Sequence, residues 1–188
     1  METILKLDNV HSFYGKSHIL QGVSLEVHEN EILCLLGRNG VGKTTTLQSI
    51  MGLIAQRSGS ILFRGQEISR IENYLIPRLG IGYVPQGRHI FSELTVRENL
   101  VIGKVTKEGK AKSLDEIFAF FPILEKRLTQ LGGTLSGGEQ QMLALARAMV
   151  PNPSLIILDE PSEGLMPKMV KLVSEIIQKV NQTGVSIL

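Results

Sequence analysis

A chain of 188 residues is long enough for one domain with a sizeable hydrophobic core. Apolar residues make up 43% of the chain and charged residues 20%, which is a globular composition. The net charge of +2 is too small to indicate a nucleic-acid partner, so the basic run KEGKAK (107–112) is interpreted as a solvated loop. The single cysteine, Cys34, excludes a disulfide framework, and its place in the apolar run ILCLLG predicts a buried thiol.

The sequence predicts neither a membrane-spanning segment nor a secretory signal. No apolar run approaches the length needed to cross a bilayer, and METILKLDN lacks a basic region followed by an apolar core. We therefore expect the protein in the cytoplasm, or attached to a membrane only through a partner.

The first part of the chain has the pattern of strands around one helix. Four segments have a strand pattern: 2–8, 19–27, 32–36 and 61–63. The continuous apolar run at 32–36 predicts a buried strand, and residues 44–53 predict a helix. Ser-Gly-Ser at 58–60 and the Arg-Gly pair at 64–65 predict turns.

The second part has helices between short apolar strands. Helical patterns occur at 95–103, 114–121, 124–131, 136–150 and 167–181, and strand patterns at 81–84, 155–158 and 185–188. Continuous Ile, Leu and Val runs separated by helices indicate parallel strands covered on both faces. The sequence therefore predicts one α/β domain over residues 1–188. Its antiparallel β region is N-terminal, and a helical subdomain at about 88–150 is inserted in the core.

A glycine-rich segment follows the apolar run at 32–36 and opens the predicted helix. GRNGVGKT (37–44) matches G-x-x-x-x-G-K-[ST] in full. Its glycines let backbone N–H groups converge on phosphate oxygens, and the helix N-terminus adds positive potential. Lys43 can reach the β- and γ-phosphates, and the Thr44 hydroxyl can bind Mg²⁺. The strand and helix on either side disfavour the alternative, a glycine-rich turn without a ligand.

Two carboxylates stand at the end of the strand SLIILDE. Ligands of open α/β sheets bind at the carboxyl ends of strands, and successive strand residues point to opposite faces. Asp159 is therefore the candidate for the Mg²⁺ shell, and Glu160 the candidate to polarise an attacking water. A solvated acidic turn is the alternative, which the upstream phosphate loop disfavours.

Two further residues have less specific signals. Gln86 follows a predicted strand and Pro85, where an amide can meet Mg²⁺ or the water, although most loop glutamines are only solvated. Tyr14 can stack on a nucleobase, but an aromatic residue on an edge strand more often serves packing.

The stretch LSGGEQ (135–140) precedes a strongly periodic helix. Ser136 and Glu139 form an S-x-x-E capping box, which explains those two residues. It does not explain Gly137 and Gly138, which are poor residues for a first helical turn. We interpret the bare backbone there as a place where another molecule, favourably an anion, approaches closely.

These motifs together resemble the nucleotide-binding subunits of ABC transporters. The resemblance rests on GRNGVGKT (37–44), YVPQ (83–86), LSGGEQ (135–140) and LIILDE (155–160), and it extends over essentially the whole chain. It implies an ATPase at the cytoplasmic face of a membrane, held there by permease subunits, with no nucleic-acid partner. It also implies a head-to-tail dimer, in which the signature stretch faces the ATP of the other subunit.

The resemblance assigns roles to individual residues. It implies catalytic roles for Glu160, Lys43 and Gln86, and Mg²⁺ binding by Thr44, Gln86 and Asp159. The implied ATP-binding residues are Tyr14, Gly37, Arg38, Asn39, Gly40, Val41, Gly42, Lys43, Thr44, Thr45, Ser136, Gly137, Gly138 and Gln140.

A finer resemblance is to importer subunits for branched-chain amino acids and urea. It rests on YVPQGRHIFSELTVRENL (83–100) and DEPSEGLMPK (159–168). Gln86, where the amino-acid group often has glutamate, favours urea slightly.

Two features depart from the family pattern. Met166 stands where many members have aspartate, which leaves one dimer-coupling contact unassigned but suits the importer group. The sequence ends at Leu188 within an apolar strand, before the position of the family's switch histidine. We therefore expect the chain to be incomplete at its C-terminus.

Three other functions remain open on the sequence. They are a soluble ABC-type ATPase of DNA repair or translation, a P-loop kinase, and a chain that binds ATP without hydrolysing it. The first usually carries a coiled coil, a zinc site or a second ATPase domain, and the second has no use for LSGGEQ.

Overall fold

The computed structural model describes residues 2–104 and 111–188, so most of the basic run at 107–112 lies outside the described residues. A four-stranded antiparallel sheet occupies the N-terminal part, in the order β2-β1-β3-β4. Its strands are β1 (Thr3–Tyr14), β2 (Ser17–His28), β3 (Gln56–Phe63) and β4 (Gln66–Glu67). This confirms the predicted antiparallel region. β1 pairs on both sides and is therefore a central strand, but Tyr14 at its end pairs only with Ser17 of β2.

The predicted turn at 58–60 is instead a continuous part of β3 that lies opposite a β-bulge in β1. The pairing of β1 with β3 shifts register between Asp8 and His11, opposite this stretch. Gly59 has a φ of +94°, and a Cβ there would collide with the backbone carbonyl of Asn9. A glycine inside a strand marks such a bulge as readily as it marks a turn, which explains the error. The Arg-Gly turn is present, with positive φ at both Arg64 and Gly65.

A three-stranded parallel sheet lies at the centre of the molecule, in the order β5-β6-β7. The strands are β5 (Ile81–Val84), β6 (Leu155–Leu158) and β7 (Ser186–Ile187), which confirms the three apolar strands predicted in the second part. All four side chains of β6 are buried. Leu155 and Ile157 pack with the antiparallel sheet, whereas Ile156 and Leu158 pack with the helices. This alternation follows from the two-residue period of a strand that is covered on both faces.

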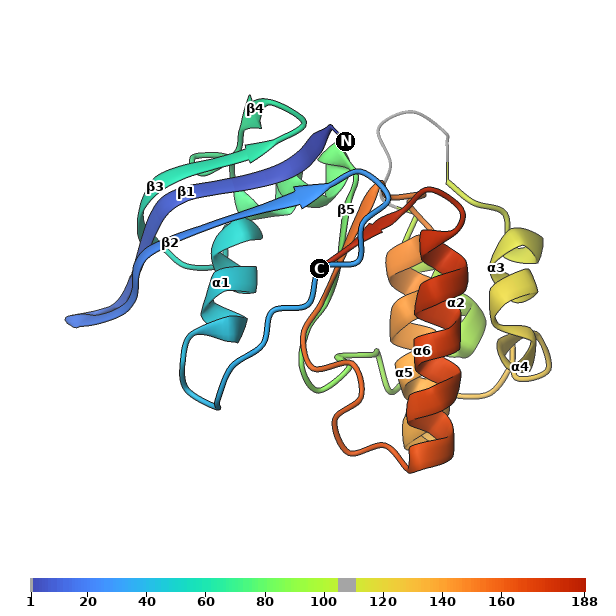
Figure 1. The fold of residues 1–188 in the computed structure, drawn as a ribbon. Coiled ribbons are helices and arrows are strands. Elements are labelled where there is room, and N and C mark those ends of the chain that lie inside the picture. The colour runs from blue at the N-terminus through green and yellow to red at the C-terminus, as the bar shows by residue number, and fades with distance from the viewer. Residues whose placement is uncertain (1, 105–110) are drawn as a thin grey trace.

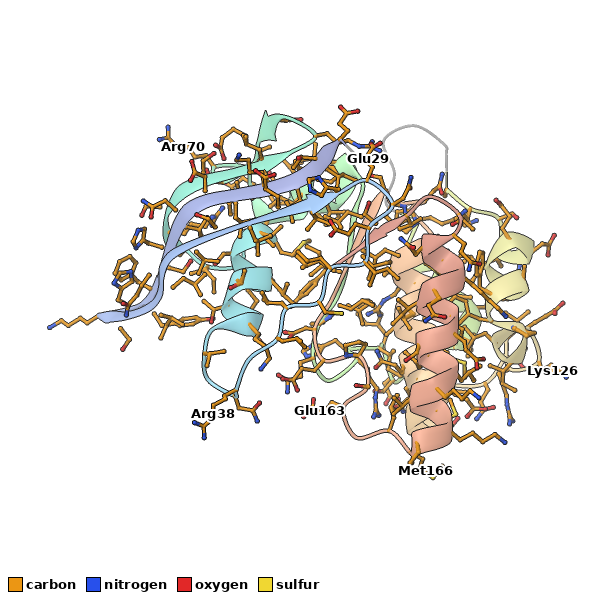
Figure 2. All side chains as sticks on the ribbon, in the orientation of Figure 1. Glu29, Arg38, Arg70, Lys126, Glu163 and Met166 are labelled. Atoms are coloured by element: carbon orange, nitrogen blue, oxygen red, sulfur yellow. The ribbon has the colours of Figure 1, made fainter. Side chains whose placement is uncertain are left out.

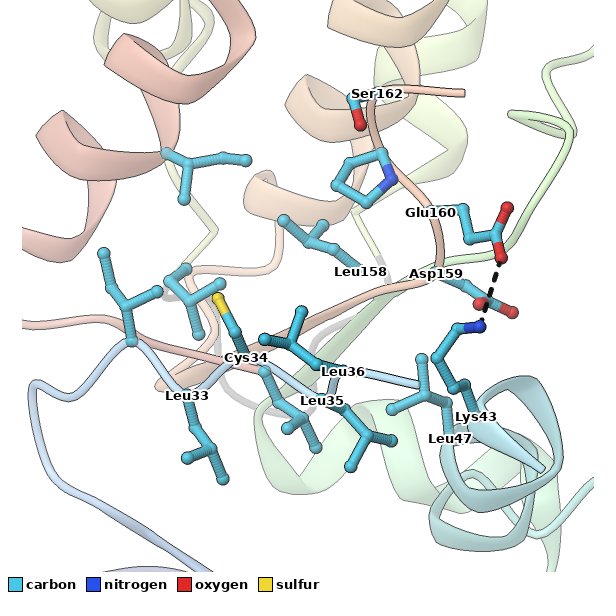
Figure 3. Close-up of a pocket in the computed structure, with 15 residues that line it drawn as sticks. Leu33, Cys34, Leu35, Leu36, Lys43, Leu47, Leu158, Asp159, Glu160 and Ser162 are labelled. Atoms are coloured by element: carbon cyan, nitrogen blue, oxygen red, sulfur yellow. Dashed lines mark ion pairs between the residues drawn. The ribbon is translucent and has the colours of Figure 1, made fainter. Parts of the chain in front are cut away.

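The predicted buried strand at 32–36 forms only a single bridge, from Ile32 to Ile187. β7 offers it only two residues for pairing, and the described residues leave the outward side chains uncovered, with Leu36 89% exposed. Cys34 is also exposed, so the prediction of a buried thiol is wrong. The segment lines an apolar cleft of about 340 Å³ next to Leu158 (Figure 3).

Helices confirm most of the predicted helical segments. They are α1 (Lys43–Ile50), α2 (Val96–Ile102), α3 (Leu114–Phe120), α4 (Pro122–Glu125), α5 (Gly137–Met149) and α6 (Pro167–Asn181), with 3₁₀ turns at Asn73–Leu79 and Gly132–Thr134. The predicted helix at 124–131 is wrong, because α4 ends at Glu125. The carbonyl of Gln130 instead accepts the N–H of Val96, which ties this stretch to the start of α2.

Figure 1 shows the antiparallel sheet with α1 on one side of the parallel sheet and α2 to α6 on the other. No helix among the described residues is long and apolar enough to span a bilayer. The division of the domain at about 88–150 stays a prediction.

Glu67 is expected to stabilise the antiparallel sheet in a pH-dependent way. Burial alone raises its pKa, but hydrogen bonds from Ser60, Ser69 and Ile61 outweigh burial and lower the pKa to about 2. The stabilisation is therefore complete above pH 4.5 and is lost as the pH falls through about 2. Glu67→Gln should cost about 1 kcal/mol at pH 7, after allowance for exposure.

Urea unfolding of wild type and Glu67→Gln between pH 7 and pH 2.5 measures this difference. Glu93→Gln is the matched control, because Glu93 is exposed and its carboxyl has no hydrogen bond among the described residues. Equal stability of wild type and Glu67→Gln at pH 7 would contradict the assignment.

Candidate active site

The loops that leave β5 and β6 meet the glycine-rich loop before α1 because parallel strands place their carboxyl ends at one edge of the sheet. Gln86 follows β5, and Asp159 and Glu160 follow β6. A cavity of about 410 Å³ lies between these loops. Its lining residues are Tyr14, Ile19, Asn39, Gly40, Gly42, Lys43, Thr44, Thr45, Gln86, Glu160 and Glu163. The structure therefore gathers candidates that span most of the chain around one cavity.

The glycine-rich loop is shaped to receive an anion. Gly40 and Gly42 have φ of +82° and +102°, which side chains rarely tolerate. No side chain caps the start of α1, so the N–H groups of its first turn stay available to a ligand. The ammonium of Lys43 donates to the carbonyls of Gly37 and Arg38 at 3.0 and 3.2 Å, and thus lies inside the loop.

Thr44 and Asp159 form the most buried polar contact of the site. The threonine hydroxyl donates to Asp159 Oδ1 at 3.1 Å, and Asp159 is only 3% exposed. Burial raises the pKa of Asp159, and the Thr44 hydrogen bond and the Lys43 charge oppose that shift. Its other oxygen, Oδ2, is buried and has no hydrogen-bond partner among the described residues. A carboxylate with a spare oxygen beside a hydroxyl provides oxygen ligands suited to Mg²⁺, so these residues fit the predicted metal.

Glu160 follows Asp159 in the turn after β6. Its Oε1 is 3.8 Å from the Lys43 ammonium, the ion pair drawn in Figure 3. Its backbone φ is +47°, a value that is uncommon for a residue other than glycine. The two neighbouring carboxylates thus have different partners, Thr44 for Asp159 and Lys43 for Glu160. Both residues lie beyond the last residue of β6, so the turn and not the strand period sets their directions.

Three residues of the site were not identified as candidates from the sequence. Glu163 lines the cavity, and its carboxylate accepts a hydrogen bond of 2.9 Å from Gln86. Tyr83, one strand away from Asp159, has a buried hydroxyl. Burial and the charge of Asp159 raise its pKa to about 12. Arg88 donates to Gln140 at 3.3 Å. No local spacing marks these residues, because their partners are far away in the sequence.

Tyr14 stands at the rim of the cavity. Its side chain is 49% exposed, and its hydroxyl donates to Gln48 at 2.9 Å. That hydrogen bond holds the phenol ring while about half of the residue stays exposed to a ligand that could stack on it.

The signature residues Ser136, Gly137, Gly138 and Gln140 do not line this cavity. They form the first turn of α5, where the predicted capping box of Ser136 and Glu139 is present. The two glycines have neighbours within the chain. A Cβ at Gly138 would clash with the Met169 side chain of α6, and a Cβ at Gly137 would meet the Arg88 guanidinium. The interpretation that only a ligand could explain the glycine pair is therefore incomplete, because Gly138 already serves packing.

Met166 precedes α6 and is exposed, with no side-chain cap at that helix start. Figure 2 shows Arg38 at the tip of the glycine-rich loop and Glu163 and Met166 in the loop before α6, along the same edge of the molecule. The site therefore opens at this edge.

A glycine-rich loop with lysine and threonine at the helix start, next to a carboxylate at the end of a buried strand, defines a P-loop nucleotide-binding ATPase. The chain belongs to the ABC transporter family, whose model matches residues 20–163. It is an ATP-hydrolysing subunit of a transporter.

Curated relatives include subunits of both import and export systems. A high-affinity branched-chain amino acid transport ATP-binding protein of Pseudomonas aeruginosa is 42% identical over 98% of this chain and 80% of its own length. A probable branched-chain amino acid transport ATP-binding protein of Archaeoglobus fulgidus is 38% identical over 94% of this chain and 76% of its own. A lipopolysaccharide export system ATP-binding protein of Haemophilus influenzae is 39% identical over 99% and 79%.

Solved structures share the fold. A nucleotide-free ATP-binding cassette from an ABC transporter superposes with a TM-score of 0.87 at 26% identity, over 99% of this chain and 80% of that one. A dimeric cassette in a post-hydrolysis state, bound to ADP and phosphate, gives 0.84 at 26% identity over 97% and 85%. The predicted fold class is thus confirmed.

Gly138→Ala is expected to destabilise the chain through contact with Met169. The added Cβ would lie 2.9 Å from Met169 Cγ, and overpacking of this kind costs about 1–3 kcal/mol, more than the helix propensity that alanine gains. Gly137→Ala is the matched control, because its Cβ meets only the flexible end of Arg88.

A double-mutant cycle with Met169→Ala, followed by urea unfolding, measures the coupling between the two residues. Met169→Ala should relieve part of the cost of Gly138→Ala. Additive effects of the two substitutions would contradict the packing role.

Proposed function

We propose that this ATPase subunit powers a membrane importer for branched-chain amino acids. The observation that carries the proposal is a complete phosphate-loop cavity in a chain that is 42% identical, over 98% of its length, to an amino acid importer subunit. Urea, which Gln86 favours, is the alternative solute within the importer group. Lipopolysaccharide export is a second candidate function, supported by the relative of 39% identity.

The chemistry follows from the residues around the cavity. Lys43 and the loop N–H groups hold the β- and γ-phosphates. Thr44, Gln86 and Asp159 would hold Mg²⁺, which would supply positive charge next to the phosphates. Glu160 orients and polarises the attacking water. Positioning and charge stabilisation account for most of the acceleration in phosphoryl transfer, so no covalent intermediate with the protein is required.

The active unit is a head-to-tail dimer in this proposal. The signature turn of α5 lies outside the cavity of its own chain, yet it keeps a glycine-rich helix start next to Arg88. A second copy placed head to tail brings Ser136, Gly137 and Gly138 to the γ-phosphate of its partner. The cassette solved as a dimer with ADP and phosphate supports a dimeric active unit.

The permease is expected to dock in a groove of about 450 Å³ lined by Leu53, Phe91, Ile102 and Arg147, among others. The three apolar side chains are about half exposed, and the lining includes no carboxylate. The Arg147 guanidinium packs over Phe91 and donates to the His89 carbonyl, but its Nη1 is buried without a partner among the described residues. This charge favours an apolar permease segment that carries a carboxylate.

Glu160→Gln is expected to bind ATP normally but to slow its hydrolysis by about 100-fold or more, because the water loses its base. In size-exclusion chromatography with ATP in the buffer, Glu160→Gln should also elute as a dimer. Glu175→Gln, on the exposed face of α6, is the matched control. A turnover equal to that of wild type would rule out the role given to Glu160.

Uptake by cells that lack this gene tests the solute. Leucine uptake should fall several-fold and should return with the wild-type gene but not with Lys43→Ala. Loss of urea uptake instead would move the assignment to urea. Unchanged uptake of both with defective lipopolysaccharide export would favour the second candidate.

A further inference from the structure

Tyr83 carries a hydroxyl that neither the packing nor the proposed chemistry uses. It is the third residue of β5 and pairs in register with Ile157 of β6. Its ring packs partly buried against the core that contains α1 and the antiparallel sheet. Its hydroxyl oxygen is buried and has no hydrogen-bond partner among the described residues. A buried donor left unpaired costs about 1–3 kcal/mol, so a working state that pairs it is favoured.

The same part of the structure holds an unpaired acceptor. Tyr83 and Asp159 line one cavity of about 390 Å³, together with Thr44, Gln48 and Gln86. Asp159 uses Oδ1 to accept from Thr44, and its Oδ2 is buried and unpaired among the described residues. One cavity wall therefore contains a spare donor and a spare, charged acceptor.

The other side chains of that cavity that can form hydrogen bonds carry no carboxylate; they are Thr44, Gln48, Gln86 and His89. Gln48 accepts a hydrogen bond from Tyr14, and Gln86 donates one to Glu163. An ionised acceptor also forms a stronger hydrogen bond than a neutral amide does. Asp159 is therefore the favoured partner for the Tyr83 hydroxyl.

We propose that Tyr83 is a positioning residue of the metal site. When Mg²⁺ and ATP are bound, its hydroxyl donates a hydrogen bond to the Asp159 carboxylate, directly or through one water. Outer-shell hydrogen bonds orient the carboxylates that hold a metal. Tyr83 touches neither nucleotide nor metal and acts through Asp159. The inference rests on the proposed binding of Mg²⁺ by Thr44 and Asp159.

Tyr83→Phe tests this role, because it removes the hydroxyl and keeps the ring. The unfolding temperature is measured against Mg²⁺ concentration at saturating non-hydrolysable ATP analogue, and the Mg²⁺ midpoint is compared between variants. The analogue chelates the same amount of metal in each sample, so a shifted midpoint reports the protein. We expect the midpoint to rise about 10-fold or more, as for other outer-shell changes. Tyr74→Phe, at an exposed tyrosine, is the matched control and should leave the midpoint unchanged.

The metal-free unfolding temperature separates positioning from packing. Without Mg²⁺, Tyr83→Phe should be no less stable than wild type, because the lost hydroxyl has no partner there. An Mg²⁺ midpoint of Tyr83→Phe equal to that of wild type overturns the proposal. A raised midpoint also overturns it if Tyr83→Phe loses as much stability without Mg²⁺ as with it, because the hydroxyl then serves packing. A separate outcome tests the metal site itself. If Mg²⁺ raises the unfolding temperature of neither wild type nor Asp159→Asn in the presence of the analogue, the proposed metal site is wrong, and the role of Tyr83 is wrong with it.

Discussion

The hydrogen bond from Thr44 to Asp159 joins two segments that are 115 residues apart in the chain, and the site depends on it. It fixes the start of α1 against the end of β6, so the glycine-rich loop and the acidic strand end share one cavity. Asp159 directly follows β6, whose side chains alternate between two hydrophobic cores. Moving β6 by one residue would exchange its faces and place Asp159 elsewhere, so core packing sets the position of the carboxylate.

Short-range signals predicted most of the fold and the inner part of the site. The motif at 37–44, the apolar run before Asp159 and the capping box at Ser136 each carry their information within about ten residues. The errors have a different origin. Residues 32–36 have a strand pattern, but a strand needs neighbours, and β7 pairs with them only at Ile32.

The same limit applies to the residues that the sequence did not identify. Tyr83 looks like an ordinary aromatic residue of a strand until Asp159 is placed beside it in space. Gly138 shows another limit, because Met169, thirty-one residues later, supplies a second reason for a glycine inside the chain. A single sequence does not distinguish a glycine that packing requires from a glycine that allows a ligand to approach.

The self-contacts of Lys43 have a consequence for nucleotide exchange. Its ammonium already has two carbonyl acceptors in the loop, so it remains held inward when no phosphate is there. An arriving nucleotide replaces neutral acceptors with charged ones, and only the difference between the two sets of bonds appears as affinity. The loop therefore does not have to refold when a nucleotide binds. Release of the product is eased because Lys43 regains the carbonyls of Gly37 and Arg38 as acceptors. An ATPase that must release ADP in every cycle benefits from a loop whose lysine has hydrogen-bond acceptors both with and without a bound nucleotide.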